Sequence, residues 1–418
     1  MQRVAVCLLL LAQVVPAAVL HGEGTPQRLS LADCVSLALA RNPLVRSAGE
    51  MYRASLARIQ QAKALPQPSI DIDSDLQPGP FQLGHSGESY LGISQTFEFP
   101  GKRATRGGIA VRESQEALAD LDLWRLQITY EIKEAFYGLL LAMEKLRHSE
   151  EDRDLANDFL DKTRVKFEAG DAPRVEVLRA RVEASKAANT AQAAMRDIRL
   201  AKARLNYLLA RGTDDPLEID GEFKPRAEIP PVEELRQRAS ASRPEARRAQ
   251  ASVEKETLRR KQGYLSYLPD FDVGLSRHRI AGEESTWDFA ISFPVPLFFW
   301  QPKRGEVREA EANLEAARRE AEHTLNLISL EVEDAYRSAA SAAEQIALFE
   351  EEMLSQAEEA YDMLLFSYLH GGAAGIDLIE SRRTLIETRK SYADSRSEYS
   401  VALAALERAV GEPQVGDD

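Results

Sequence analysis

The chain has 418 residues, of which 44% are hydrophobic and 29% are charged. This balance fits neither a disordered chain nor a bundle of membrane-spanning helices, and the length allows about two or three domains. The 53 lysine and arginine residues against 67 aspartate and glutamate residues give a net charge of −14. This charge argues against nucleic acid or an anionic lipid surface as the partner, so we expect any charged ligand to be cationic.

Residues 1–20 have the pattern of a cleavable export signal. Arg3 precedes an apolar run over residues 4–15, and small residues precede the polar segment that starts at His21. No later stretch is long and apolar enough for a membrane helix. We therefore expect the mature chain to be soluble or to cross a membrane as β-strands. Cys34 is then its one cysteine, and we expect it to be a small buried helix residue.

Two segments, residues 69–99 and about 270–295, alternate with the period of two that is typical of β-hairpins. One face is apolar and includes Ile70, Ile72, Phe271, Phe289 and Ile291. The opposite face carries Asp71, Asp73, Asp75, Asp270 and Asp272. A soluble sandwich with one buried face is the simplest alternative. Strands of about 8 to 12 residues can also cross a bilayer, with the apolar face towards lipid and the aspartates lining a lumen. Four strands cannot close a barrel, so strands from several chains would have to close it together.

Very long helices follow each hairpin. Residues 306–370 contain neither proline nor glycine, and small or apolar residues from Leu314 to Tyr368 cover 54 positions in 15 steps, an average of 3.6. A helix of this length extends about 98 Å. Residues 104–168 match it in the first half of the chain. Glycine turns at residues 170–173 and 371–375 then lead into second helices that end near residues 210 and 410.

The chain repeats itself at an offset of about 201 residues. The paired landmarks include Asn42-Pro43 with Arg243-Pro244, Lys102-Arg103 with Lys303-Arg304, and Gly170 with Gly371. We therefore predict two tandem copies of one unit, at residues 21–211 and 232–411. A linker at 212–231, rich in glycine and proline, separates them, and a short tail occupies 412–418. The predicted fold class is mainly α, with a small membrane β portion.

No catalytic or cofactor-binding constellation emerges from the sequence. Pro100-Gly101-Lys102-Arg103 lacks the spacing of a phosphate-binding loop, and the six histidines are too scattered for a high-affinity metal site. We therefore expect neither enzymatic activity nor a cofactor.

The order of these features resembles the TolC-like outer membrane efflux proteins. The matching pieces are the segment from Leu29-Ser30-Leu31 to Asn42-Pro43, Phe99-Pro100-Gly101-Lys102-Arg103, the two glycine turns and the duplication. The Gly-Lys-Arg form is most similar to the branch for cation and heavy-metal efflux. The resemblance implies a homotrimer whose twelve strands form an outer-membrane barrel and whose twelve helices form a periplasmic tunnel. It also implies docking to a periplasmic adaptor and to an inner-membrane pump of the resistance-nodulation-division type.

The resemblance also suggests roles for residues near the glycine turns. Asp377 and Glu380 match the acidic constriction at the tunnel entrance, and Tyr368 matches a tyrosine of the closing network. The expected basic residue near Ala373 is absent, and Arg382 or Arg383 is a candidate substitute. Adaptor contacts are expected at the tips, at Gly170, Asp171, Ala172, Gly371, Gly372 and Ala373. The simpler alternatives are solvated carboxylates at a helix start and turns that only reverse the chain.

Two other functions stay open at this stage. The same architecture would suit a conduit for type I protein secretion. A secreted coiled-coil scaffold or adhesin would explain the helices but not the aspartate-backed hairpins, and it would dissolve without detergent.

Overall fold

The computed structural model describes residues 28–75, 87–295 and 302–412. The predicted export signal and residues 413–418 of the tail lie outside this part of the chain. The first half contains α1 (Leu31–Arg41), α2 (Pro43–Lys63), β1 (Ser69–Asp75), β2 (Glu88–Phe97), α3 (Lys102–Ala169) and α4 (Arg174–Leu208). The second half contains α5 (Val232–Ser242), α6 (Pro244–Leu265), β3 (Phe271–Ile280), β4 (Thr286–Ser292), α7 (Pro302–Leu348), a π-helical turn η2 (Phe349–Met353), α8 (Leu354–Leu369) and α9 (Gly375–Val410). The same order of helices and hairpin thus occurs twice.

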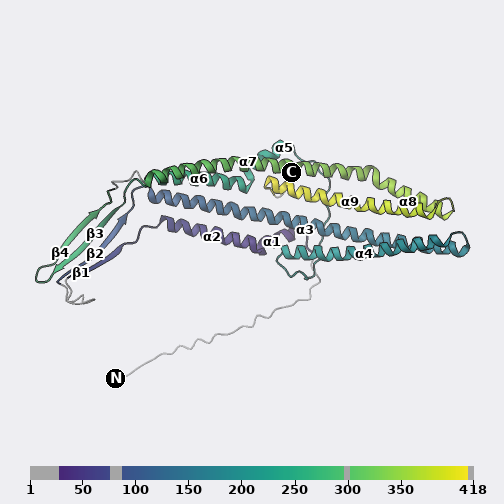
Figure 1. Cartoon of the computed structure of the whole chain (residues 1–418), viewed down its shortest axis with the longest axis horizontal. Coiled ribbons are helices and arrows are strands. Elements are labelled where there is room, and N and C mark those ends of the chain that lie inside the picture. The colour runs from purple at the N-terminus through teal and green to yellow at the C-terminus, as the bar shows by residue number, and fades with distance from the viewer. Residues whose placement is uncertain (1–27, 76–86, 296–301, 413–418) are drawn as a thin grey trace, which may run out of the picture.

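The molecule is a long rod with the sheet at one end and both glycine turns at the other (Figure 1). The two hairpins form one antiparallel sheet in the order β1-β2-β3-β4. The central pairing of β2 with β3 joins the two halves of the chain, and Gly92 lies opposite Ser276 in it.

The helices follow the predicted boundaries closely, with one difference. Helix α3 has 68 residues and runs without a break, which corresponds to about 100 Å. In the second half, the expected single helix over 306–370 is divided by η2 into α7 and α8. A π turn holds about one residue more than an α turn, and the spacing of apolar residues does not report this change in backbone hydrogen bonding. At this turn Tyr392 of α9 donates a hydrogen bond to Glu350 (2.8 Å).

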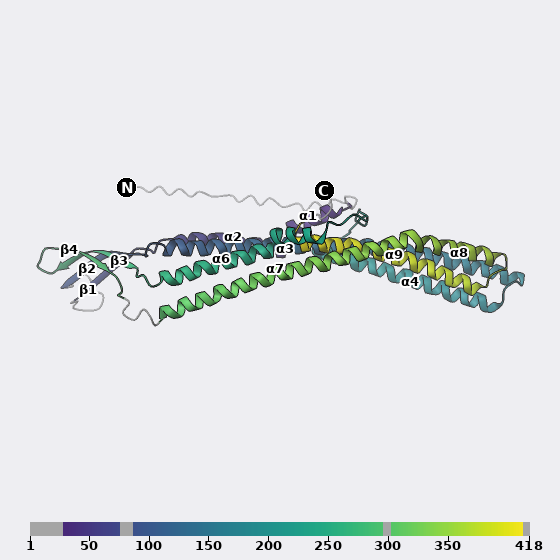
Figure 2. The ribbon, with the colours of Figure 1, turned by 90° about the horizontal axis from the view of Figure 1, so that it is seen from above.

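Helix α3 is the centre of the packing, because it contacts α2, α4, α6 and α9 (Figure 2). One hydrophobic cluster lies midway along the rod and includes Cys34, Phe136 and Leu205, so Cys34 is buried in a helix as expected. A second cluster lies near the glycine turns and contains Phe159, Tyr368 and Leu378. The side-chain core therefore joins the hairpin of α3 and α4 to the hairpin of α8 and α9.

Residues 212–231 form no helix and pack against both halves of the chain. The backbone N–H of Leu29 donates to the carbonyl of Glu218 (3.0 Å). Further along, the N–H of Lys224 donates to the Ser400 hydroxyl (3.0 Å). Phe223 is buried. The segment predicted as a linker is thus held in place by hydrogen bonds and by its own apolar side chains.

Candidate functional site

One face of the sheet gathers carboxylates. Residues opposite one another in an antiparallel sheet project to the same side, and the register pairs Asp71 with Gly92, Asp73 with Tyr90 and Asp75 with Glu88. Asp272 of β3 lies opposite Thr96 and accepts a hydrogen bond from its hydroxyl (2.5 Å). The predicted polar face is therefore continuous across β1, β2 and β3.

The other face of the sheet is apolar and uncovered in the single chain. The register aligns Ile70 with Ile93, Ile93 with Leu275, and Leu275 with Phe289. Their side chains stay highly exposed, at 72% for Ile70 and 67% for Phe289. A continuous face of exposed apolar side chains is unfavourable in water, which indicates that this face contacts lipid or another protein.

Asp270 differs from the other four aspartates. It lies one residue before β3, where its carboxylate accepts hydrogen bonds from the Phe99 backbone N–H (2.7 Å) and from Lys102 Nζ (2.8 Å). Lys102 is the first residue of α3. This contact links the two hairpins at the junction of sheet and helices. The ammonium group of Lys102 offsets the negative charge of Asp270.

The two glycine turns have the same backbone geometry at the far end of the rod. Gly170 has φ +87° and Gly371 has φ +78°, in the left-handed region that favours glycine. In each turn a backbone N–H bonds back five residues, from Asp171 to Lys166 and from Gly372 to Ser367, both at 2.8 Å. The same geometry ends both long helices, as the matching glycines predict.

The six predicted tip residues are not equally accessible. Gly170, Asp171, Gly371 and Gly372 are exposed and Ala373 is half-buried, whereas Ala172 is buried. A partner can therefore reach the backbone of the three glycines and the side chains of Asp171 and Ala373. A groove of about 470 Å³ lies beside the turns, between α4 and α9, and its lining includes Val175, Leu178, Ile376 and Glu380. Pattern analysis did not identify this groove, because its two walls are 200 residues apart.

Asp377 and Glu380 both lie in the first turns of α9 with exposed side chains. The Asp377 carboxylate accepts a hydrogen bond from the Ala374 backbone N–H (3.3 Å), which caps the helix. Their spacing of three residues puts both carboxylates on one side of the helix. The structure thus brings these two predicted residues together.

Tyr368 contacts α3 through a buried side chain. It is buried, and its hydroxyl lies 3.0 Å from that of Thr163 on α3. Its ring packs against Phe159, and the ammonium of Lys166 lies 4.3 Å from the ring centre. Burial raises the pKa of the Tyr368 hydroxyl, which keeps it neutral. In the single chain, Tyr368 holds α8 against α3.

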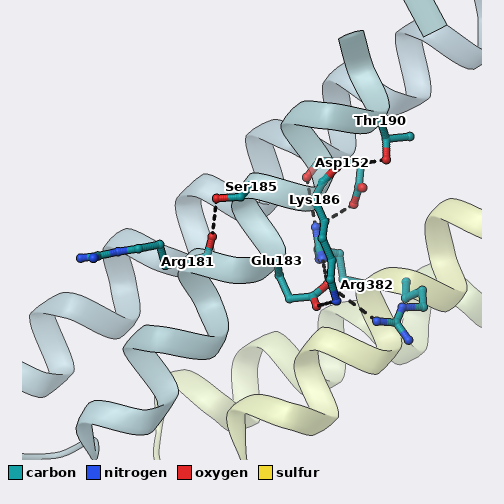
Figure 3. A network of polar contacts seen from close by, with 8 residues as sticks. Asp152, Arg181, Glu183, Ser185, Lys186, Thr190 and Arg382 are labelled. Carbon is teal, nitrogen blue, oxygen red and sulfur yellow. Dashed lines mark hydrogen bonds and ion pairs between the residues drawn. The ribbon is translucent and has the colours of Figure 1, made fainter. Parts of the chain in front are cut away.

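A buried ion cluster that the residue pattern does not predict lies around Arg382, two residues after Glu380 in α9 (Figure 3). The guanidinium of Arg382 donates to the Asp152 carboxylate of α3 (2.7 Å) and lies 3.4 Å from Glu183 of α4. The exposed fraction of the Arg382 side chain is only 6%, against 49% for Arg383. Three helices therefore meet at Arg382. Neither arginine is paired with Asp377 or Glu380 in the part of the chain that the structure describes.

The pKa values of the two carboxylates in this cluster shift in opposite directions. Burial raises the pKa of Asp152, and the charge of Arg382 only partly offsets this effect. Burial acts in the same direction on Glu183, but a hydrogen bond from Lys186 and the charges of Lys186, Arg382 and Arg383 lower its pKa overall. Glu183 is therefore the more firmly ionised partner of Arg382.

Within residues 28–75, 87–295 and 302–412, no group of three histidine, cysteine, aspartate or glutamate side chains is arranged to hold a metal ion. None of the helices in these ranges is both long and apolar enough to cross a bilayer.

Comparisons with known proteins agree with this geometry. A model of the outer membrane efflux protein family matches residues 34–211 and 235–412. The cobalt-zinc-cadmium resistance protein CzcC of Cupriavidus metallidurans is 23% identical to this chain over 397 residues, which cover 92% of this chain and 90% of CzcC.

Solved structures have the same fold. The outer membrane protein VceC of Vibrio cholerae has a TM-score of 0.77 at 18% identity, with 91% of this chain and 96% of VceC covered. CusC, whose crystal structures concern folding and transmembrane channel formation, has a TM-score of 0.78 at 15% identity, with 91% of this chain and 92% of CusC covered.

Proposed function

Because the chain belongs to the outer membrane efflux protein family, we propose that it is the outer-membrane conduit of a tripartite system that expels divalent metal cations. The protein is an outer-membrane efflux channel, as its family membership and its fold indicate. The observation that carries the proposal is the sheet, with carboxylates on one face and exposed apolar side chains on the other. A membrane pore needs this division, because its outer wall meets hydrocarbon and its inner wall meets water.

The proposed assembly is a homotrimer. One chain supplies four strands, and β1 and β4 are the unpaired edges of its sheet. An open edge in lipid would leave backbone N–H and carbonyl groups without hydrogen bonds, which costs several kcal/mol for each group. Twelve strands from three chains would close the sheet into a barrel, and the helices would continue it into the periplasm as a tunnel.

The proposed cargo is cationic. Asp71, Asp73, Asp75 and Asp272 would line the lumen, and the carboxylates would raise the local concentration of cations there. CzcC, which is related to this chain over nearly its whole length, is named for resistance to cobalt, zinc and cadmium. An acidic wall of separate carboxylates would attract these ions and still let them pass.

The tips and the first turn of α9 would form the periplasmic entrance. The exposed turns and the apolar groove between α4 and α9 would receive a periplasmic adaptor, which connects the channel to an inner-membrane pump of the resistance-nodulation-division type. Three copies of Asp377 and Glu380 would place six carboxylates around the entrance. Tyr368, buried against α3 in each chain, would hold α8 in the closed arrangement.

Deletion of the gene tests the function. Cells without the channel should lose tolerance to cobalt, zinc and cadmium salts, and a plasmid copy of the wild-type gene should restore it while an empty plasmid does not. Unchanged metal tolerance together with sensitivity to drugs would reassign the cargo. Loss of a secreted protein instead would indicate type I secretion.

The assembly is tested separately by the mass of the detergent-solubilised particle. We expect about three times the mass of the mature chain and no extraction without detergent. A stable monomer in plain buffer would contradict the trimer and favour a soluble scaffold.

A further inference from the structure

Two arginines interrupt the apolar face of the sheet close to the hairpin turn. Arg277 lies opposite Leu91 on one side and Trp287 on the other, and Arg279 lies opposite Ser89. This register puts both guanidinium groups on the apolar side of the sheet, away from the aspartates. Charged side chains on a surface that faces lipid are costly, so their presence there needs an explanation.

Neither arginine forms an ion pair or hydrogen bond with another described residue, and both are exposed. His278, which lies between them in sequence, projects to the polar face and contacts Glu88 (2.7 Å). The sheet thus places a carboxylate beside the histidine on its polar face and leaves the two arginines on its apolar face available for another anion.

The arginines border a hollow of about 470 Å³. On the apolar side its walls are Ile72, Ser74, Ser89, Leu91, Arg277 and Arg279. Asp73 and Tyr90 also border it, but their places in the register direct them to the polar face. Two guanidinium groups beside two aliphatic side chains suit a ligand with an anionic head and a hydrocarbon tail.

The position along the strand matches the edge of a membrane. Arg279 is eight residues from Phe271, or about 26 Å along the strand, which a tilt of about 40° reduces to about 20 Å, close to the ~25 Å apolar band of such barrels. Phe271 stacks on Phe97 at the end near the helices, and Trp287 is 66% exposed at the other end. Aromatic side chains mark both edges of this band, and arginines near an edge extend their charged groups towards the lipid heads.

We propose that Arg277 and Arg279 bind the phosphate group of an outer-leaflet lipid. The inference rests on the proposed function, because it requires the apolar face to contact the bilayer with the hairpin turns outside. The net charge of −14 makes general attraction to an anionic surface unfavourable, so this contact is local. Bidentate hydrogen bonds from the guanidinium groups would hold the phosphate, while Ile72 and Leu91 contact the acyl chains.

The test uses the full-length protein in phosphatidylcholine nanodiscs that contain a small fraction of lipid A, a phosphorylated outer-leaflet lipid. Native mass spectrometry counts the lipid A molecules retained by each particle. We expect the pair Arg277→Gln and Arg279→Gln to lower retention at least about tenfold, and Arg277→Lys with Arg279→Lys to lower it less. The control pair Arg46→Gln and Arg58→Gln, at exposed positions on α2, should retain as much lipid as the wild type.

The wild-type protein provides a second measurement that does not depend on the folding of a variant. Dephosphorylated lipid A should be retained no better than phosphatidylcholine, and millimolar inorganic phosphate should not displace lipid A. Equal retention of both forms of lipid A, or displacement by free phosphate, overturns the lipid-phosphate site while the channel proposal stands. Failure of the wild type to insert into phosphatidylcholine alone overturns both proposals.

Discussion

At the scale of single residues, Arg382 is the best-defined polar contact between the helical hairpins. It lies in α9 and bonds to Asp152 of α3 across 230 positions of the sequence. All three members of its cluster are largely buried, with exposed side-chain fractions of 6% for Arg382, 17% for Asp152 and 13% for Glu183. Ions removed from water are stable only while paired, so the cluster resists separation of α9 from α3 and α4. Any movement of α9 away from α3 and α4 has to break or rearrange these contacts.

Glu183→Gln should weaken this cluster in a way that depends on pH. At pH 7 we expect a loss of about 1–2 kcal/mol in the free energy of unfolding, because a buried charge-assisted contact is removed. The pKa of Glu183 in the folded chain lies below its ordinary value of 4.5. Its ionised form therefore stabilises the fold fully above pH 4.5, and this contribution is lost as the pH falls through the folded-state pKa.

Thermal unfolding of the detergent-solubilised protein at pH 7 and at progressively lower pH measures this difference. The variant and the wild type should converge below pH 4.5. Glu315→Gln, at an exposed position on α7, should differ little from the wild type at any pH. If the stability difference between Glu183→Gln and the wild type grows as the pH falls, ionised Glu183 does not stabilise the cluster.

Asp377 and Glu380 are the residues on which the proposed entrance depends. Six carboxylates in a trimer should bind divalent cations and reduce the current through a reconstituted channel. Asp377→Asn combined with Glu380→Gln should raise the concentration of divalent cation needed for block from the periplasmic side at least about tenfold. Glu387→Gln, an exposed change two turns later, should leave block unchanged. Equal block in the double variant would place both residues on a solvated helix face.

At the scale of elements, the glycine turns decide where the rod ends. Gly170 and Gly371 both adopt positive φ, and neither has a neighbour that an added methyl group would contact. Their requirement for glycine is therefore conformational and not steric. The turns also bring the tip residues to one end of the molecule, so the ends of both helical hairpins would meet the same partner (Figure 1).

Gly371→Ala should destabilise the protein by about 1–2 kcal/mol, because an L-residue pays a steric cost in the left-handed region. Gly49→Ala is the matched control, since Gly49 lies inside α2 and also has open space around its Cα atom. In a helix the added methyl should stabilise by about 0.5–1 kcal/mol. Denaturant unfolding of the two variants measures both effects, and a shift in the same direction for both would refute the conformational explanation.

At the scale of the whole molecule, the two faces of the sheet connect the fold to its surroundings. The register carries the alternation of each strand across all four strands, so one side stays mainly apolar, apart from Arg277 and Arg279, and the other side collects the aspartates. The central β2–β3 pairing makes this continuity possible, because it places the second hairpin in register with the first. The helices then extend the structure away from the sheet as a long rod.

Replacement of Asp71, Asp73, Asp75 and Asp272 by asparagine should reduce cation selectivity. In a planar bilayer with a salt gradient, the wild-type channel should show a reversal potential of the sign that indicates cation selectivity. The reversal potential of the fourfold variant should lie closer to zero, because fixed negative charge is lost from the lumen. Asp214→Asn with Asp220→Asn, exposed changes in the segment between the two halves, should keep the wild-type value. Anion selectivity that is the same in the wild type and the variant would show that these aspartates do not line the pore.

Much of the architecture could be predicted from the sequence because its signals are local. A helical period of 3.6 sustained over more than 50 residues, strands of period two and glycines at the turns each depend on neighbouring positions. These patterns predicted α3 to within two residues at its start and one at its end. The alternation also separates the aspartates from the apolar residues of each strand without any knowledge of how the strands pair.

The tertiary structure decided which distant residues meet. The family resemblance makes Arg382 a candidate substitute for a missing gate residue, yet packing directs it to Asp152 and Glu183. Tyr368 turns towards Thr163 in a buried core, and Arg277 joins Arg279 beside a hollow that exists only once β1, β2 and β3 are paired. Periodicity tells which side of an element a residue occupies. It cannot tell which residue of another element lies opposite, because that depends on the register and packing of segments far apart in the chain.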